Sequence, residues 1–172
     1  MEEPKTVKLE ADLWDLEQII DTYGSRIFRM CFLYLGEKQL AEDAVQDTFL
    51  KVYQHRQEFR RESSELTWIT RIAINVCKNY RRIAWFRHVD QAVELEKIGI
   101  SCEDRIADDT VIREVMNLNA KYKEVILLYY YQQMTIKEIA ASLGISEGTV
   151  STRLHRGRER LKAALKGWYF DE

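Results

Sequence analysis

Apolar residues recur every three or four positions along most of the chain, which is the spacing of one face of an α-helix. The sequence shows no strand-like alternation of apolar and polar residues, and its one proline, Pro4, lies near the N-terminus. The pattern therefore predicts an all-α protein. We expect helices near residues 12–35, 38–55, 65–85, 109–118, 120–132, 135–143 and 146–167. Gly24 can interrupt the first of them.

Residues 135–161 have the pattern of two helices joined by a tight turn. Thr135 followed by Glu138 forms a capping box, which predicts the start of a helix. Gly144 suits a helix end because glycine adopts the left-handed conformation at little cost, and Ser146 can cap the following helix. This arrangement predicts a helix-turn-helix whose second helix enters the major groove of DNA.

The second of these helices has two distinct faces. The apolar stripe expected to face the core is Val150, Leu154, Gly157 and Leu161. The other positions carry short polar or basic side chains, which can reach base edges and neutralise phosphates. An amphipathic helix with a solvated basic face would look similar, but the capped helix before it favours DNA binding. The predicted contacts with duplex DNA are Ser151, Thr152, Arg153, His155, Arg156 and Arg158.

The predicted helix over residues 41–55 has an apolar stripe and, opposite to it, an isolated leucine. The inward stripe is Ala41, Ala44, Val45, Thr48, Phe49, Val52 and His55. Leu50 lies on the other side among acidic and amide side chains, which suggests a protein-docking surface, although single exposed apolar residues are common. The predicted docking residues are Asp43, Gln46, Asp47, Leu50 and Lys51.

A polar loop and a basic helix face occupy residues 59–83. The expected inward stripe is Trp68, Ile69, Ile72, Ala73, Val76, Tyr80 and Ile83, and Thr67 and Thr70 are expected on the other side. A basic helix beside a polar loop can follow a single DNA strand and hold an extruded base, whereas core packing would also explain Phe59. The predicted strand contacts are Phe59, Arg60, Arg61, Ser63, Ser64, Asn75, Lys78, Asn79, Arg81 and Arg82.

Charge is unevenly distributed in a chain whose net charge is −2. Residues 60–87 carry seven basic groups against two acidic, and residues 153–166 carry six against one. The first 21 residues and residues 90–109 each hold seven acidic groups against two basic. Two basic patches separated by acidic segments predict weak binding to free DNA unless a partner arranges them.

Composition excludes several other classes of protein. No apolar run is long enough to span a membrane, and no signal peptide is expected. Cys31, Cys77 and Cys102 lack CxxC spacing, so we expect reduced, partly buried thiols and a cytoplasmic protein. The histidines do not accompany the cysteines at ligand spacing, so we expect no metal site. No cofactor is indicated.

In this order, the motifs resemble a bacterial RNA polymerase sigma factor of the extracytoplasmic-function (ECF, group 4) class, and the resemblance covers nearly the whole chain. Residues 41–53 are similar to region 2.2, which docks on the β′ clamp helices of the polymerase. Residues 67–82 resemble regions 2.3 and 2.4, which melt and read the −10 element. Residues 120–166 resemble region 4, which reads the −35 element. Asn79 stands where the family often has aspartate, and His155 where the residue varies with the promoter.

The resemblance implies two small helical domains joined by a flexible linker: region 2 over residues 10–85, the linker over 86–107 and region 4 over 108–168. It implies a transcription initiation factor rather than an enzyme, with core polymerase (β′ clamp helices and β flap) and promoter DNA as partners. No small-molecule substrate or cofactor is implied. Members of this class are commonly inhibited by an anti-sigma factor, often membrane-bound, so a cytoplasmic protein that can be held at the membrane is expected.

Three other interpretations stay open from the residues alone. A stand-alone helix-turn-helix regulator would bind its promoter tightly without polymerase and leaves the motifs of residues 41–83 unexplained. An enzyme acting on nucleic acid would use Glu42, Asp43 and Asp47 as metal-binding carboxylates, although no further ligands complete such a site. A structural adaptor would make the basic patch over residues 60–87 accidental.

Overall fold

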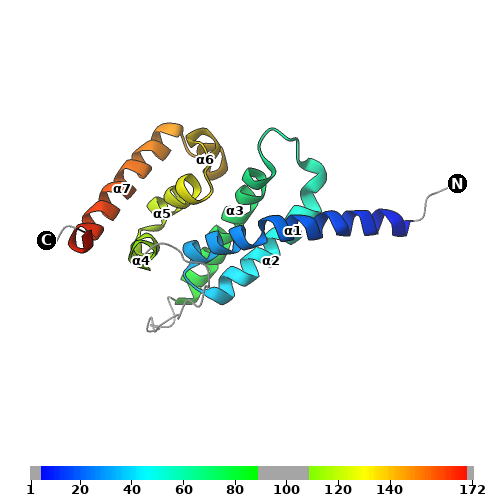
Figure 1. The fold of residues 1–172 in the computed structure, drawn as a ribbon, viewed down its shortest axis with the longest axis horizontal. Helices are drawn as coiled ribbons and strands as arrows, with labels where there is room; N and C mark the ends of the chain where they lie inside the picture. Colours follow the sequence, from blue (N-terminus) through cyan, green and yellow to red (C-terminus); the bar gives the residue numbers. More distant parts are fainter. Residues whose placement is uncertain (1–4, 89–108, 170–172) are drawn as a thin grey trace.

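The computed structural model describes the backbone of residues 5–88 and 109–169, which is helical apart from short connections (Figure 1). No strand occurs in these two ranges, and the predicted all-α class is confirmed. The elements are α1 (Lys5–Leu35), α2 (Lys38–His55), the 3₁₀ turn η1 (Arg56–Glu58), α3 (Glu65–His88), α4 (Asp109–Asn117), α5 (Ala120–Ile126), the π-helical segment η2 (Leu127–Tyr131), α6 (Ile136–Leu143) and α7 (Glu147–Tyr169). Most of the predicted linker and Cys102 lie outside the described residues.

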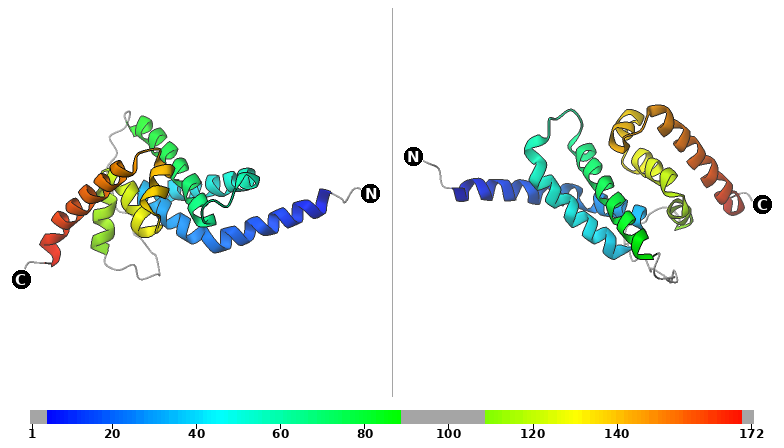
Figure 2. Two further views of the ribbon diagram at one scale, coloured as in Figure 1. Left: turned by 90° about the horizontal axis from the view of Figure 1, so that it is seen from above. Right: turned by 180° about the vertical axis from the view of Figure 1, so that it is seen from behind.

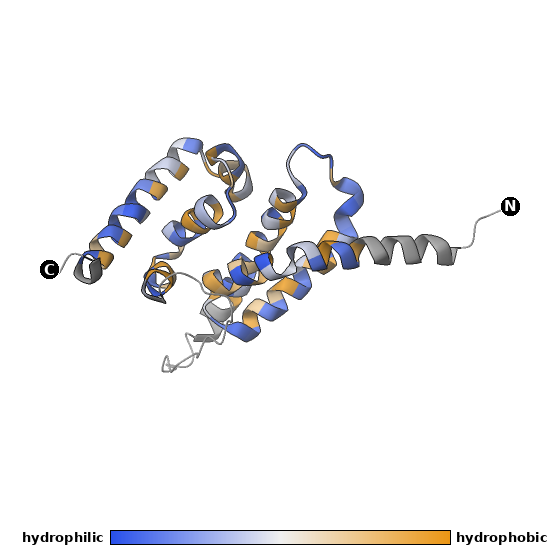
Figure 3. Cartoon of the chain, in the orientation of Figure 1, coloured by the Kyte–Doolittle hydropathy of each residue, from blue (hydrophilic) through white to orange (hydrophobic). Residues whose placement is uncertain are grey.

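Helices α1, α2 and α3 form an N-terminal bundle in which each helix packs against the other two (Figures 1 and 2). Its core contains Ile27, Met30, Val52, Ile69 and Ile74, all with no more than a trace of exposed surface. The apolar faces of all three helices turn towards one another (Figure 3). Burial of these side chains is what stabilises the three helices together, since isolated helices of this length are marginal in water.

The interior of this bundle also contains two cysteines. Cys31 and Cys77 are buried free thiols, as expected. A hydrogen bond between the two thiols, followed by burial, raises the pKa of Cys77 far above its usual range. Gly24 does not interrupt α1, which is continuous from Lys5 to Leu35.

Four positions of the predicted faces differ in the structure. Thr67 and Thr70 of α3 are buried although they were expected on the solvent side. The reason is that α3 is covered on more than one side, and the Thr67 hydroxyl donates a hydrogen bond to Glu138 of α6 at 3.3 Å. Ile83, expected in the core, lies near the end of α3 with 48% of its surface exposed. His55 is also exposed and contacts Glu58.

Helices α4 to α7 form a C-terminal bundle that contains the predicted helix-turn-helix. The capping box is present, because the Thr135 hydroxyl accepts from the Glu138 amide and the Glu138 carboxylate accepts from the Thr135 amide. These hydrogen bonds lower the pKa of Glu138, the backbone bond contributing most. Gly144 ends α6 with φ +67°, and the Ser146 hydroxyl accepts from the Thr149 amide at 3.1 Å. Both capping predictions are confirmed.

The helix expected over residues 120–132 changes its winding after Ile126. From Leu127 to Tyr131 the segment is π-helical, and the amide of Gln132 donates to the Leu127 carbonyl five residues back. The wider turn buries Leu127 and leaves Tyr129 and Tyr130 exposed. The chain then passes through Gln133 at φ +58°. Periodicity alone does not indicate this wider turn, since π-turns are rare and depend on tertiary context.

None of the helices in the described ranges combines the length and apolar character needed to cross a bilayer.

Candidate nucleic-acid interface

The outer face of α7 presents most of the predicted duplex contacts together. Ser151, Thr152, His155, Arg156 and Arg158 are exposed, whereas Val150 and Leu154 on the opposite stripe are buried. The Thr152 hydroxyl donates to the Gly148 carbonyl at 2.9 Å, which leaves its oxygen able to accept a further hydrogen bond. This face can therefore offer both hydroxyl groups and guanidinium forks to base edges.

Arg153 is directed differently from the other predicted contacts. Its Nη1 lies 2.9 Å from Oε1 of Glu124 on α5, in a charge-assisted hydrogen bond. Only 7% of the Glu124 side chain and 26% of the Arg153 side chain are exposed. A buried carboxylate requires a partner, so Arg153 ties α7 to α5 instead of facing outwards. In the sequence, the inward direction of Arg153 is indicated by its position directly before Leu154, at the edge of the apolar stripe.

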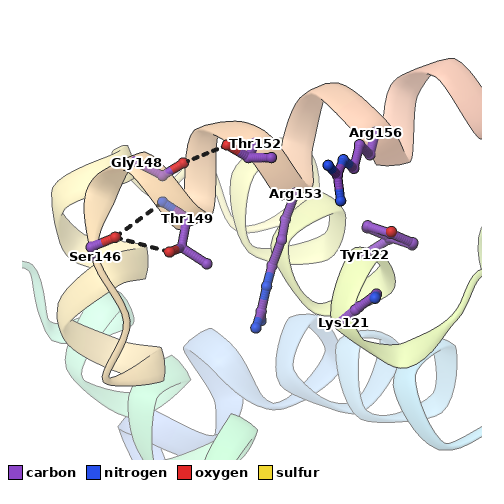
Figure 4. A pocket seen from close by; sticks show the side chains of 8 residues that line it. All are labelled: Lys121, Tyr122, Ser146, Gly148, Thr149, Thr152, Arg153 and Arg156. Carbon is purple, nitrogen blue, oxygen red and sulfur yellow. Dashed lines mark hydrogen bonds between the residues drawn. The ribbon is translucent and has the colours of Figure 1, made fainter.

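Beside the outer face, α7 and α5 enclose a hollow of about 510 Å³ that the sequence did not indicate (Figure 4). Its walls combine hydroxyl, aromatic and basic side chains. The lining residues are Lys121, Tyr122, Ser146, Gly148, Thr149, Thr152, Arg153 and Arg156. All of them belong to α5, α7 or the turn before α7. The hollow thus adds α5 to the surface that adjoins the predicted DNA contacts.

Tyr122 is the centre of the cationic cluster at this hollow. The Lys121 Nζ and the Arg160 Cζ each lie 5.0 Å from the centre of its ring, a distance that gives cation–π attraction. Burial raises the pKa of Tyr122, but the charges of Lys121 and Arg160, and hydrogen bonds with Arg156 and Lys121, outweigh it and the net shift is downwards. The Tyr122 hydroxyl is therefore surrounded by cations.

The predicted single-strand contacts divide into exposed groups and groups that serve the fold. Exposed groups are Arg60, Arg61, Ser64, Asn75, Asn79, Arg81 and Arg82, and Ser63 is half-buried. Phe59 packs against Trp68 with ring centres 5.1 Å apart, and the Ser64 hydroxyl accepts from the Thr67 amide at 3.0 Å. Core packing and capping therefore account for part of this loop's composition.

Lys78, one of the predicted strand contacts, forms an ion pair with the C-terminal bundle. Its Nζ lies 3.7 Å from Oε2 of Glu124, the carboxylate that also binds Arg153. Nearby, burial and the charge of Arg81 lower the pKa of Lys123 on α5. The basic face of α3 thus faces the C-terminal bundle at Lys78, while Asn79 beside it remains exposed.

Arg26 of α1 makes two polar contacts with the C-terminal bundle. Its Nη2 donates to the Tyr131 carbonyl at 2.8 Å, and its Nε donates to Gln132 Oε1 at 3.1 Å. Tyr131 closes the π-helical segment, so the altered winding presents a carbonyl to α1. These polar contacts accompany apolar ones, because the buried apolar residues of the two bundles form one continuous cluster.

The predicted docking surface on α2 is centred on an exposed leucine. Leu50 is 54% exposed, and Gln46, Lys51 and Tyr53 around it are exposed as well. Asp43 and Asp47 are half-buried. Asp47 accepts a hydrogen bond from the Tyr80 hydroxyl at 2.8 Å; burial first, and then this bond, raise the pKa of Tyr80 to about 12. Asp47 therefore also joins α2 to α3.

Comparison with known proteins identifies two family segments in this chain. The family profile described as Sigma-70 region 2 matches residues 19–87, and that described as Sigma-70, region 4 matches residues 109–161. The ECF RNA polymerase sigma factor SigW of Bacillus subtilis is 30% identical over 163 residues, covering 86% of this chain and 87% of that protein. SigL of Mycobacterium tuberculosis is 29% identical over 157 residues, covering 88% and 89%.

A solved structure shares the fold. The sigma factor RpoE from Bartonella quintana, crystallised with the anti-sigma factor NepR, superposes with a TM-score of 0.78 at 24% identity, over 92% of this chain and 99% of RpoE. CnrH, solved with the cytosolic domain of CnrY, gives a TM-score of 0.63 at 24% identity, over 89% and 88%. Both similarities concern the fold, that is, the arrangement of the helices.

Replacing Arg26 by alanine should loosen the contact between the bundles without unfolding either one. The substitution removes two hydrogen bonds from a charged donor, each worth about 1.5–3 kcal/mol in favourable cases. We expect a larger radius of gyration in small-angle X-ray scattering and unchanged hydrogen-exchange protection within α3 and α7. Lys38→Ala, which removes an exposed ion pair within α2, is the control. Unchanged scattering from Arg26→Ala would show that other contacts hold the bundles together.

Proposed function

Because this chain belongs to the ECF RNA polymerase sigma factors, we propose how its two bundles divide promoter recognition between them. The protein is a transcription initiation factor that binds core RNA polymerase and directs it to specific promoters. Two observations support this division of promoter recognition. The region 2 match lies on the N-terminal bundle and the region 4 match on the C-terminal bundle, and each bundle has exposed basic side chains. We assign region 2 to residues 10–85, the linker to residues 86–107 and region 4 to residues 108–168.

Region 4 reads the −35 element as duplex DNA in this proposal. Ser151, Thr152, His155 and Arg156 on the exposed face of α7 contact base edges, and Arg158 contacts the backbone. Arg153, which we included among the predicted contacts, acts instead by holding α7 on α5 through Glu124. The exposed hydroxyl and guanidinium groups lie along one helix face, as a helix in the major groove requires.

Region 2 opens and reads the −10 element. The loop Phe59–Glu65 receives a flipped base of the non-template strand, and the strand then follows the exposed basic end of α3. The strand contacts on α3 are Asn75, Lys78, Asn79, Arg81 and Arg82. Unstacking and flipping a base costs a few kcal/mol, which one basic helix does not supply alone. Polymerase binding supplies the geometry and the remaining contacts.

The contact between the bundles has to open before region 2 can use Lys78. In the compact arrangement Glu124 compensates the charge of Lys78, so this lysine cannot neutralise a phosphate at the same time. When the bundles separate, Glu124 retains its shorter contact with Arg153 at 2.9 Å. Region 4 consequently stays intact when the bundles separate. Binding to polymerase is the event that holds them apart.

Partners and location follow from family membership. Core polymerase docks on α2 around Leu50 through its β′ clamp helices, while its β flap contacts region 4. The solved structures of RpoE and CnrH contain an anti-sigma factor and the cytosolic domain of CnrY, respectively, so we propose that an anti-sigma factor also controls this protein. Such a partner can be membrane-bound. The protein itself works in the cytoplasm, where polymerase and DNA are, with no cofactor and no chemistry of its own.

Promoter binding should depend on core polymerase. In a gel-shift experiment, the chain alone should bind promoter DNA weakly because its basic groups are divided between two bundles and the net charge is −2. Addition of core polymerase should produce a complex that depends on both promoter elements. Tight, sequence-specific binding without polymerase would instead identify a stand-alone regulator.

Leu50→Asp should abolish assembly with core polymerase while the chain stays folded. An exposed apolar side chain is replaced by a charge that a docked surface would have to desolvate. Pull-down with core enzyme measures assembly, and circular dichroism checks folding. Ile20→Asp is the matched control, since Ile20 is a similarly exposed apolar residue on α1. Asp47→Arg is a poorer test because Asp47 also accepts the hydrogen bond from Tyr80. Normal assembly of Leu50→Asp would reject the docking surface.

Arg156→Ala should cost about 1–3 kcal/mol of binding and relax sequence choice at one −35 base, as expected for loss of a bidentate base contact. The measurement is holoenzyme affinity for a set of promoters that differ at single −35 positions. Equal weakening on every sequence would show that Arg156 contacts only phosphate.

A further inference from the structure

The hollow between α5 and α7 is the feature that the predicted DNA contacts do not account for. Its volume is about 510 Å³ (Figure 4). Among the residues that line it, Arg153 is compensated by Glu124 at 2.9 Å. Lys121 and Arg156 have no carboxylate within ion-pair distance among the residues whose side chains the structure describes. The hollow therefore carries two uncompensated cations, one from each helix.

The hydroxyl groups at the hollow are already engaged and define its wall. The Ser146 hydroxyl bonds the Thr149 amide at 3.1 Å and the Thr149 hydroxyl at 2.9 Å, and Thr152 donates to the Gly148 carbonyl (Figure 4). These bonds fix the first turns of α7. An incoming anion would accordingly be bound mainly by the two cations.

A close approach of α7 to α5 holds these cations in place. A Cβ added to Gly157 would lie 3.1 Å from Ile126 Cγ1 and 3.5 Å from Tyr122 Cβ, so glycine allows the two helices to meet here. Arg160, one turn beyond this contact on α7, then lies over the Tyr122 ring at 5.0 Å. Tyr122 is buried, and the side chain of Arg156 points towards it (Figure 4). The interaction with Arg156 is one of the causes that lower the pKa of Tyr122. Lys121 completes the cluster over the same ring.

We propose that this hollow binds a backbone phosphate of the −35 DNA, with Lys121 as a contact from outside the helix-turn-helix and Tyr122 as the positioning residue of Arg156. The inference rests on the proposed function of region 4. Thr152 and Arg156 belong both to the hollow and to the exposed face of α7. A duplex whose bases meet that face therefore places its backbone at the rim of the hollow. A backbone phosphate carries one negative charge, and two flanking cations can contact its oxygens from both sides.

Lys121→Gln tests the phosphate contact. Holoenzyme affinity is measured on promoters with single −35 substitutions over a series of salt concentrations. Loss of one phosphate contact should weaken binding about threefold or more, equally on every promoter, and reduce the slope of log K against log salt by about 1. Lys121→Arg should retain the slope. Lys38→Gln, which removes an exposed lysine on α2, controls for net charge. An unchanged slope, or a loss confined to particular sequences, would overturn the phosphate contact.

Tyr122→Phe tests the positioning role separately, because phenylalanine keeps the ring and its packing but removes the hydroxyl. We expect weaker discrimination at the base read by Arg156, in the same direction as Arg156→Ala but smaller, with the salt slope unchanged. Hydrogen-exchange protection of α7 should stay as in the unaltered protein. Unchanged discrimination would overturn the positioning role of the hydroxyl.

The outcome for Arg156→Ala separates this inference from the proposal that it rests on. If that variant leaves the preference among −35 sequences and the affinity unchanged, region 4 does not read the element through α7 and both proposals fail. If Arg156→Ala relaxes sequence choice while Lys121→Gln changes neither affinity nor salt slope, only the phosphate site fails.

Discussion

Glu124 lies on α5 with 7% of its side chain exposed, and a carboxylate at that depth requires compensation of its charge. Arg153 of α7 supplies it at 2.9 Å, and Lys78 of α3 adds a second cation at 3.7 Å. Removing one partner of a buried ion pair costs on the order of 3–5 kcal/mol. The shorter contact therefore fixes the recognition helix on its own bundle, and the longer one joins this bundle to the N-terminal bundle.

The unequal strength of these two contacts allows the compact arrangement to open. Lys78 is 31% exposed, so its pairing with Glu124 is screened by solvent and weaker than the Arg153 contact. Arg26 also donates hydrogen bonds to Gln132 and to the Tyr131 carbonyl, and Thr67 donates one to Glu138; water can replace such bonds. Separation of the bundles thus leaves no buried carboxylate without a partner. The same carboxylate that holds α7 in place also pairs with Lys78, the lysine that we propose as a strand contact.

Gly157 and Tyr122 determine which basic residues of α7 face outwards and how firmly they are held. The short approach at Gly157 brings α7 over Tyr122, whose ring centre then lies 5.0 Å from both the Lys121 Nζ and the Arg160 Cζ. A larger residue at 157 would have to displace the Ile126 side chain. The face that we propose for DNA binding is consequently formed by α5 and α7 together.

The sequence by itself determined the helices, the capping box of Thr135 and Glu138, the turn at Gly144 and the exposed position of Leu50, because periodicity and cap chemistry are local properties. It also indicated the family through the order of its motifs. Only the tertiary structure decided that Arg153 turns inward and that Lys78 is paired, because both depend on Glu124, which is distant from them in the sequence. Thr67 is likewise buried because α6 packs against it. The π-helical turn after Ile126 and the hollow at Lys121 and Tyr122 likewise arise where separate helices pack, and the spacing of residues along one helix carries no information about the helix across from it.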